Sequence, residues 1–116
     1  MFDFNINNSI WKVIEKEKKE LLDKYNKEHE DEATFVFGLT SYSNHEIWIN
    51  EEMCIEQKIN TLKHELTHCY IWSYGLYNAP HYTDEMVCDI VSSINDFINE
   101  VVTKYKEALA QEKEKK

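Results

Sequence analysis

The chain lacks an excess of positive charge and has no long apolar run. Its 13 Lys and Arg stand against 22 Asp and Glu, which gives a formal net charge of −9 at pH 7. Binding to a nucleic-acid backbone or to an anionic membrane requires a positive face, so we expect neither kind of partner. No window approaches the ~20 apolar residues that cross a bilayer, so no membrane-spanning helix is expected.

Paired cysteines and a secretion signal are also missing. The three cysteines, Cys54, Cys69 and Cys88, are odd in number and widely spaced. The first residues have neither the basic start nor the apolar run of a signal peptide. This combination is typical of reduced thiols in a cytosolic protein, and we therefore expect a cytoplasmic location. The apolar helical pattern around each cysteine predicts that all three are buried structural residues.

Enough apolar material is present for one small core. Of the 116 residues, 42% are hydrophobic and 13% are aromatic, which are values of a globular chain. A chain of this length builds a single core, so we expect one domain over residues 1–116. The ends, about residues 1–8 and 108–116, are expected to fray.

The spacing of apolar residues predicts a helix followed by two strands. The helix is expected from Ile10 to about Glu30, after a capping-type run at residues 7–9, with its apolar side chains on one side. The strands Thr34–Thr40 and Glu46–Asn50 are indicated by alternation with a period of two. The residues between them form a turn.

Two further helices are expected in the second half of the chain. Asn50 is a suitable cap for the first of them, which ends near Gly75, because glycine adopts the left-handed conformation that terminates helices. The last helix begins at Thr83, after a loop that contains the only proline. The order predicts a small α+β domain of zincin-like fold, in which a short curled sheet packs on helices.

The most informative stretch of the chain lies in the second helix and reads HExxH. Its residues are His64-Glu65-Leu66-Thr67-His68. One helical turn separates the two histidines, so both imidazoles project from one face and can reach one tetrahedral zinc ion at about 2.0–2.1 Å. Glu65 then lies beside the open coordination position, where it can take a proton from zinc-bound water. The plain alternative is a helix with two surface histidines and a solvated glutamate.

A catalytic zinc needs a third protein ligand, and two residues after the motif are candidates. Glu85 lies in the first turn of the last helix, and Asp89 follows it on the same helical face, where its carboxylate can orient a ligand histidine. His81, in the preceding loop, is the other candidate ligand. His81 or Tyr82 can alternatively donate a hydrogen bond to a developing oxyanion.

The motif and its downstream residues resemble a known family. Residues 61–68, a loop, and residues 84–89 are similar to the gluzincin pattern, HExxH followed by ExxxD on the next helix. The compact layout resembles minimal gluzincins and the ImmA/IrrE-like peptidases, including small versions encoded by phages and mobile elements. The resemblance covers about Phe35 to Ile98. It implies zinc ligands at His64, His68 and Glu85, a general base at Glu65, and a supporting carboxylate at Asp89.

These observations predict a zinc-dependent peptidase that acts on a protein or peptide substrate, with Glu65 as general base. One alternative is an SprT-like protease, because Ala79-Pro80-His81 is similar to the segment in which those enzymes carry a third histidine ligand. The other alternative is a zinc-stabilised binding module without catalysis. A purely structural site does not need a base, so Glu65 argues against that module.

Overall fold

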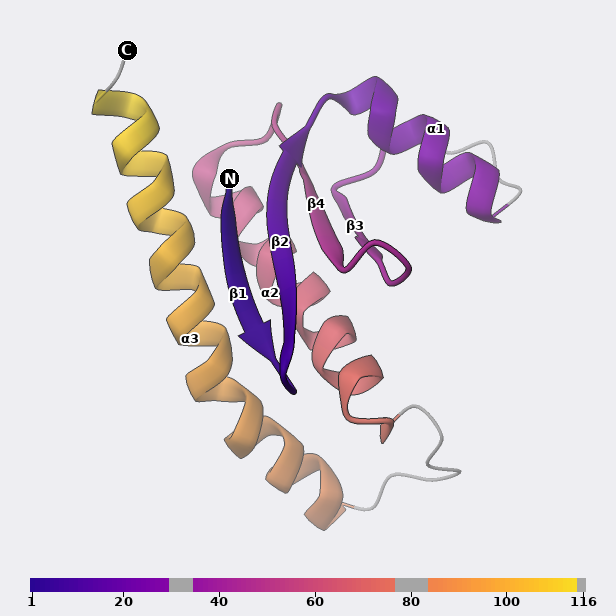
Figure 1. Cartoon of the computed structure of the whole chain (residues 1–116), viewed down its shortest axis with the longest axis vertical. Helices are drawn as coiled ribbons and strands as arrows, with labels where there is room; N and C mark the ends of the chain where they lie inside the picture. Colours follow the sequence, from indigo (N-terminus) through magenta and orange to yellow (C-terminus); the bar gives the residue numbers. More distant parts are fainter. Residues whose placement is uncertain (30–34, 77–83, 115–116) are drawn as a thin grey trace.

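The computed structural model describes residues 1–29, 35–76 and 84–114, which form four strands and three helices (Figure 1). The sequence prediction of an α+β domain is confirmed. The elements are β1 (Phe2–Ile6), β2 (Ser9–Lys16), α1 (Lys18–His29), β3 (Gly38–Ser41), β4 (Glu46–Asn50), α2 (Ile55–Ser73) and α3 (Asp84–Glu114).

The four strands form one mixed sheet in the order β1-β2-β4-β3. The pairs β1–β2 and β3–β4 are antiparallel, whereas β2 and β4 run parallel, so β1 and β3 are the two edges. Helices α2 and α3 pack on one face of this sheet, and α3 runs along the β1 side (Figure 1). The opposite face carries a smaller cluster with α1, formed by Leu21, Val36 and Leu39.

The first sixteen residues form a hairpin, so the predicted helix from Ile10 to Glu30 is wrong over its first part. Side chains alternate between buried and exposed along both strands, with Phe4, Ile6, Trp11 and Val13 all in the core. A helix here would place Trp11 and Val13 on different faces, whereas a strand buries both. Only the second part of the predicted helix is helical, as α1.

A two-residue turn joins the strands of this hairpin. Asn7 and Asn8 have φ of 46° and 63°, the positive values that a tight turn between antiparallel strands requires and that Asn tolerates. The expected fraying of residues 1–8 is therefore wrong, because β1 contributes Phe4 and Ile6 to the core. The side-chain amide of Asn7 donates to the carbonyl of Ser73 at 2.8 Å, which satisfies a carbonyl in the last turn of α2.

The last helix also continues further than expected. Val101, Val102 and Tyr105 of α3 are buried in the main core, and Leu109 packs against it. The helix extends to Glu114, so fraying of the segment 108–114 is not observed. A long apolar stripe that packs on β1 and α2 holds this end of the chain in place.

The boundaries of α2 correct one capping prediction and confirm another. Asn50 does not cap the helix, which begins at Ile55. Its side chain is buried instead, accepts from the Glu52 amide at 2.9 Å and donates to the Val36 carbonyl at 3.0 Å, so it orders the loop after β4. The helix ends as predicted, since Gly75 follows its last turn with a φ of 69°.

The cysteines are free thiols, but their predicted burial holds only for Cys69. Cys54 and Cys88 are exposed, because Cys54 precedes the first turn of α2 and Cys88 lies on the outer side of α3. The helices within the described residues fall short of what a membrane crossing requires in length and apolar character.

Candidate metal and catalytic site

The HExxH residues lie on α2 at the border between its buried and exposed faces. Leu62, Leu66 and Cys69 are fully buried at three- and four-residue spacing and pack against the sheet. Glu65 shares that face and is only 8% exposed. His64 and His68 are exposed, as expected for residues at the edge of the same stripe. The helix therefore buries the carboxylate and leaves the imidazoles at the surface.

The two histidines converge on one point. Their Nε2 atoms are 3.1 Å apart, and their rings meet at 76° with centroids 4.8 Å apart. Two nitrogen ligands of a tetrahedral zinc ion at about 2.0–2.1 Å stand roughly 3.3–3.4 Å from each other. The pair is within a few tenths of an ångström of that spacing. Imidazole nitrogens on adjacent helical turns are also the donor type that zinc prefers, so this half of the site fits the metal.

Glu65 is held by the edge strand β3. The hydroxyl of Thr40 donates to Oε2 of Glu65 at 2.6 Å, a length typical of a hydroxyl bound to a carboxylate. A buried carboxylate is costly without such a partner. The other oxygen, Oε1, accepts no hydrogen bond from any residue that the structure describes, and Glu65 lines the adjoining cleft.

A cleft of about 370 Å³ opens over these groups. The cleft is lined by strand β3, by His64, Glu65 and His68 of α2, and by Tyr25 and Glu28 of α1. A second hollow of about 440 Å³ continues from it past Phe35 and Phe37, two aromatic residues that are 39% and 53% exposed. His64 and Glu65 line both hollows, so the candidate site lies where they meet.

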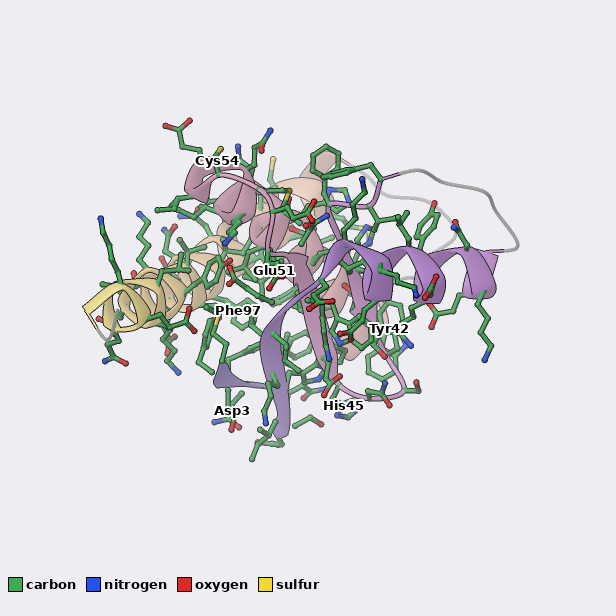
Figure 2. All side chains as sticks on the ribbon, turned by 90° about the horizontal axis from the view of Figure 1, so that it is seen from above. Asp3, Tyr42, His45, Glu51, Cys54 and Phe97 are labelled. Carbon is green, nitrogen blue, oxygen red and sulfur yellow. The ribbon has the colours of Figure 1, made fainter. Side chains whose placement is uncertain are left out.

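Tyr42 lies at the other end of the cleft, where β3 turns toward β4. Its ring centroid lies 6.4 Å from that of Trp11 and 5.3 Å from that of Trp72 (Tyr42 is labelled in Figure 2). Burial first, and then the nearby charge of Glu65, raises the pKa of the Tyr42 phenol. The hydroxyl therefore stays protonated at neutral pH and is available as a donor in the cleft.

Sequence reasoning missed both Thr40 and Tyr42. The sequence predicts that Thr40 ends a strand and that Tyr42 lies in a turn, and it indicates no role in the site for either residue. The detectable signal was weak: alternate residues of a strand share a face, so Gly38, Thr40 and Tyr42 had to point the same way. The packing of the sheet decides whether this shared face points toward α2 or away from it.

Of the remaining predicted site residues, the structure describes the side chain of Asp89 but not those of Glu85, His81 and Tyr82. Glu85 lies in the first turn of α3, but its side chain is outside the described part, and so are His81 and Tyr82. Asp89 is described and exposed on α3, and no hydrogen bond to His64 or His68 is recorded for it. Among the side chains that are described, no set of three His, Cys, Asp or Glu forms a metal site. The third ligand thus stays a prediction.

No family model, curated protein or solved structure matches this chain. The geometry of the site itself is therefore the basis for a proposed function.

Proposed function

We propose that the protein is a zinc-dependent peptidase. The observation that carries the proposal is the convergence of two imidazole Nε2 atoms, 3.1 Å apart, beside a buried carboxylate in an open cleft. A solvated surface helix with two incidental histidines would have no reason to bury the glutamate between them. The arrangement supports metal-assisted hydrolysis over that plain alternative.

His64 and His68 would hold the zinc ion, with Glu85 as the proposed third ligand from the first turn of α3. Bound zinc supplies a Lewis acid that polarises a carbonyl group and lowers the pKa of water. Asp89, one turn after Glu85, is proposed to orient one of the histidines. The zincin-like character of the fold is part of this proposal.

Glu65 has the position of a general base. Its Oε2 is fixed by Thr40, and Oε1 would be the oxygen that accepts a proton from the attacking water in the cleft. The same carboxyl group would then pass the proton to the departing amine. Tyr42, Tyr82 and His81 are the candidates for a hydrogen bond to the oxyanion, and of these the structure describes Tyr42.

The open edge of β3 is a suitable place for a peptide. Phe37 accepts from the Asn50 amide at 2.9 Å, in register with the β3–β4 pairs. Backbone groups alternate between the two sides of an antiparallel strand, so Leu39 and Ser41 also face β4, whereas Gly38 and Thr40 face outward. These two residues line the cleft beside Glu65. We propose that an extended protein or peptide substrate pairs with them by strand addition.

Metal content tests the first half of the proposal. The purified protein should bind about one zinc ion per chain, and a His64→Ala/His68→Ala double variant should bind none. Chelation should lower the melting temperature of the wild type, because the metal ties α2 to α3. Full zinc occupancy in the double variant would rule out this site.

Turnover tests the second half. Glu65→Gln preserves the shape and the Thr40 contact but removes the base, so peptidase turnover should fall by about two to four orders of magnitude while zinc content stays near one. A screen of unstructured proteins and peptide libraries supplies the substrate. Undiminished cleavage by the Gln variant would show that Glu65 is not the base.

Three substitutions test which residue is the third ligand. Glu85→Ala should weaken zinc binding severely, Asp89→Ala by about 10- to 100-fold, and His81→Ala hardly at all. Competition with a chromogenic chelator measures all three. Loss of zinc in His81→Ala with retention in Glu85→Ala would replace the gluzincin-like assignment with the SprT-like one.

A zinc-stabilised binding module is the second candidate, and one observation favours it. Glu65 is buried and hydrogen-bonded within the protein, as a purely structural glutamate would be. Zinc binding combined with equal behaviour of the wild type and Glu65→Gln in every cleavage assay would support the module. In either case we propose a cytoplasmic setting, which the three free cysteines support.

A further inference from the structure

We propose that Thr40 is a positioning residue for catalysis, and that its hydroxyl fixes the carboxylate of Glu65 in the orientation that accepts the proton. This inference rests on the proposed peptidase function and adds a residue from outside the HExxH motif. Its basis is the 2.6 Å contact between Thr40 Oγ1 and Glu65 Oε2, which joins the edge strand to the motif helix.

The hydroxyl proton of Thr40 has one good acceptor. The backbone carbonyl of Glu65 is also within reach, but at 3.4 Å it is far beyond the usual O–H···O distance of about 2.7–2.8 Å. The short contact to Oε2 therefore takes the proton. Among the described residues, no Lys or Arg pairs with Glu65, so this neutral donor is its principal constraint.

The two oxygens of the carboxylate consequently have different roles. Oε2 is held against β3, Oε1 accepts no hydrogen bond from the described residues, and the side chain of Glu65 lines the cleft together with His64 and His68. The terminal torsion of a glutamate has broad, weak preferences, so a carboxylate without a partner would sample many orientations. General-base catalysis depends on the lone pair that points at the proton, which is why a fixed Oε2 matters.

The fold holds Thr40 at this distance from α2. Residue 38, two positions earlier on the same face of β3, is a glycine, and an added Cβ there would come within 2.7 Å of Thr61 Cγ2 on α2. The absence of a side chain thus lets the strand approach the helix. Thr40 itself is β-branched, so few rotamers are open to it and its hydroxyl is pre-oriented.

Thr40 also connects the base to the substrate. Its backbone N–H and C=O face the open edge of β3, where the peptide is proposed to pair, while its side chain faces α2. The residue that fixes the register of the peptide is then the residue that fixes the carboxylate. A shift of about 1 Å between reacting groups can cost about 100-fold in rate. One residue with both contacts would fix the distance between the peptide and the carboxylate.

Thr40→Val and Thr40→Ser test the proposal. Val keeps the shape and removes the donor, so kcat should fall by about 10- to 100-fold with KM changed less than about twofold. Ser keeps the donor and should retain kcat within about threefold. Thr103→Val is the matched control, because the Thr103 hydroxyl donates to Asn99 within α3, away from the cleft. Zinc content should stay near one in all variants.

The second readout does not require turnover. In protein with ¹³C-labelled glutamate, the Glu65 carboxyl resonance is identified by its loss in Glu65→Gln. It should move in Thr40→Val, return toward its original position in Thr40→Ser, and stay in place in Thr103→Val. If Thr40→Val does not fold, Thr40→Ala serves in its place, since it also lacks the donor and is smaller.

A double-variant cycle separates this inference from the proposed function. If Thr40 acts through Glu65, Thr40→Val should cause no further loss of turnover in the Glu65→Gln background. Wild-type turnover that survives in Thr40→Val, or an equal loss in both backgrounds, would overturn the positioning role and leave the peptidase proposal intact. Absence of turnover in the zinc-loaded wild type would overturn the peptidase proposal and this role with it.

Discussion

Glu15 and Glu65 are two glutamates withdrawn from solvent in the same small domain, and their surroundings differ in kind. Glu15 on β2 forms an ion pair with Lys58 of α2 at 2.6 Å and accepts from the Tyr105 hydroxyl of α3 at 3.0 Å. Glu65 has one neutral donor, Thr40, and lines a cleft. Glu15 is paired with a cation, whereas no Lys or Arg in the described part of the chain forms an ion pair with Glu65.

The contrast distinguishes a glutamate used for stability from one available for chemistry. Both partners of Glu15 bind the same oxygen and come from elements on the covered face of the sheet, so the group joins β2, α2 and α3. Glu65 is anchored through one oxygen and lines the cleft, an arrangement that suits the general base proposed above.

Removal of Lys58 should have the largest effect on folding. Lys58→Met keeps the aliphatic packing and leaves Glu15 without its cation, which should lower the free energy of unfolding by about 2–3 kcal/mol, or roughly 10 °C in melting temperature. The pair retains some exposure, 12% and 16% for the two side chains, so the loss falls below that of a fully buried pair.

Lys63→Met is the control for this change, because Lys63 lies on the exposed side of the same helix. Urea denaturation measures both variants. An equal loss in Lys63→Met would show that helix propensity and not the ion pair is responsible. Turnover per folded molecule should be unaffected by Lys58→Met, in contrast to Glu65→Gln.

Gly38→Ala should have an intermediate effect on the free energy of unfolding, and it tests the surroundings of Glu65. The new Cβ would lie 2.7 Å from both Thr61 Cγ2 and the backbone carbonyl of Trp48, so the strand must shift away from α2 at a cost of about 1–3 kcal/mol. The shift also separates Thr40 from Glu65, so turnover should fall together with stability.

The double variant Gly38→Ala/Thr61→Ser checks the cause. It removes the methyl group on α2 but not the carbonyl of Trp48, so calorimetry should show only partial recovery of the melting temperature. Full recovery would mean that the contact with the backbone carbonyl is unimportant.

Tyr105→Phe should have the smallest effect on the free energy of unfolding, and the size of this effect should depend on pH. Glu15 keeps Lys58 in this variant, so loss of the phenol donor should cost about 1 kcal/mol at neutral pH. Burial first, and then Glu15, raises the pKa of the Tyr105 phenol above its usual 10.0. The folded state therefore holds this proton more tightly than the unfolded chain does.

The stability linked to that proton is complete below pH 10 and is lost as the pH rises further, because the unfolded chain ionises first. Wild type should lose up to about 1.4 kcal/mol per pH unit from this group above pH 10, and Tyr105→Phe should not. The free energies of unfolding of the wild type and Tyr105→Phe, measured by urea denaturation, should consequently become more similar at alkaline pH. A constant difference would show that Tyr105 ionises at its ordinary pKa.

Local sequence patterns predicted the elements around the motif well. The spacing of His64 and His68 placed both rings on one side of α2, and Gly75 marked the end of that helix. The helix predicted from Ile10 is wrong over residues 10–16, because the apolar residues there fit a strand as well as a helical face and continue the alternation of Phe2, Phe4 and Ile6. That alternation, with Asn7-Asn8 as the turn, was the readable signal for a hairpin.

The sequence by itself determined that His64 and His68 converge in the candidate site, because the turn of an α-helix brings residues four apart together whatever surrounds it. Only the tertiary structure decided that β3 lies at the sheet edge, that Thr40 meets Glu65 from 25 residues away, and that Tyr105 reaches Glu15 across 90 residues. Contacts of this kind depend on how the sheet and helices pack, and no local periodicity encodes which side chains then meet.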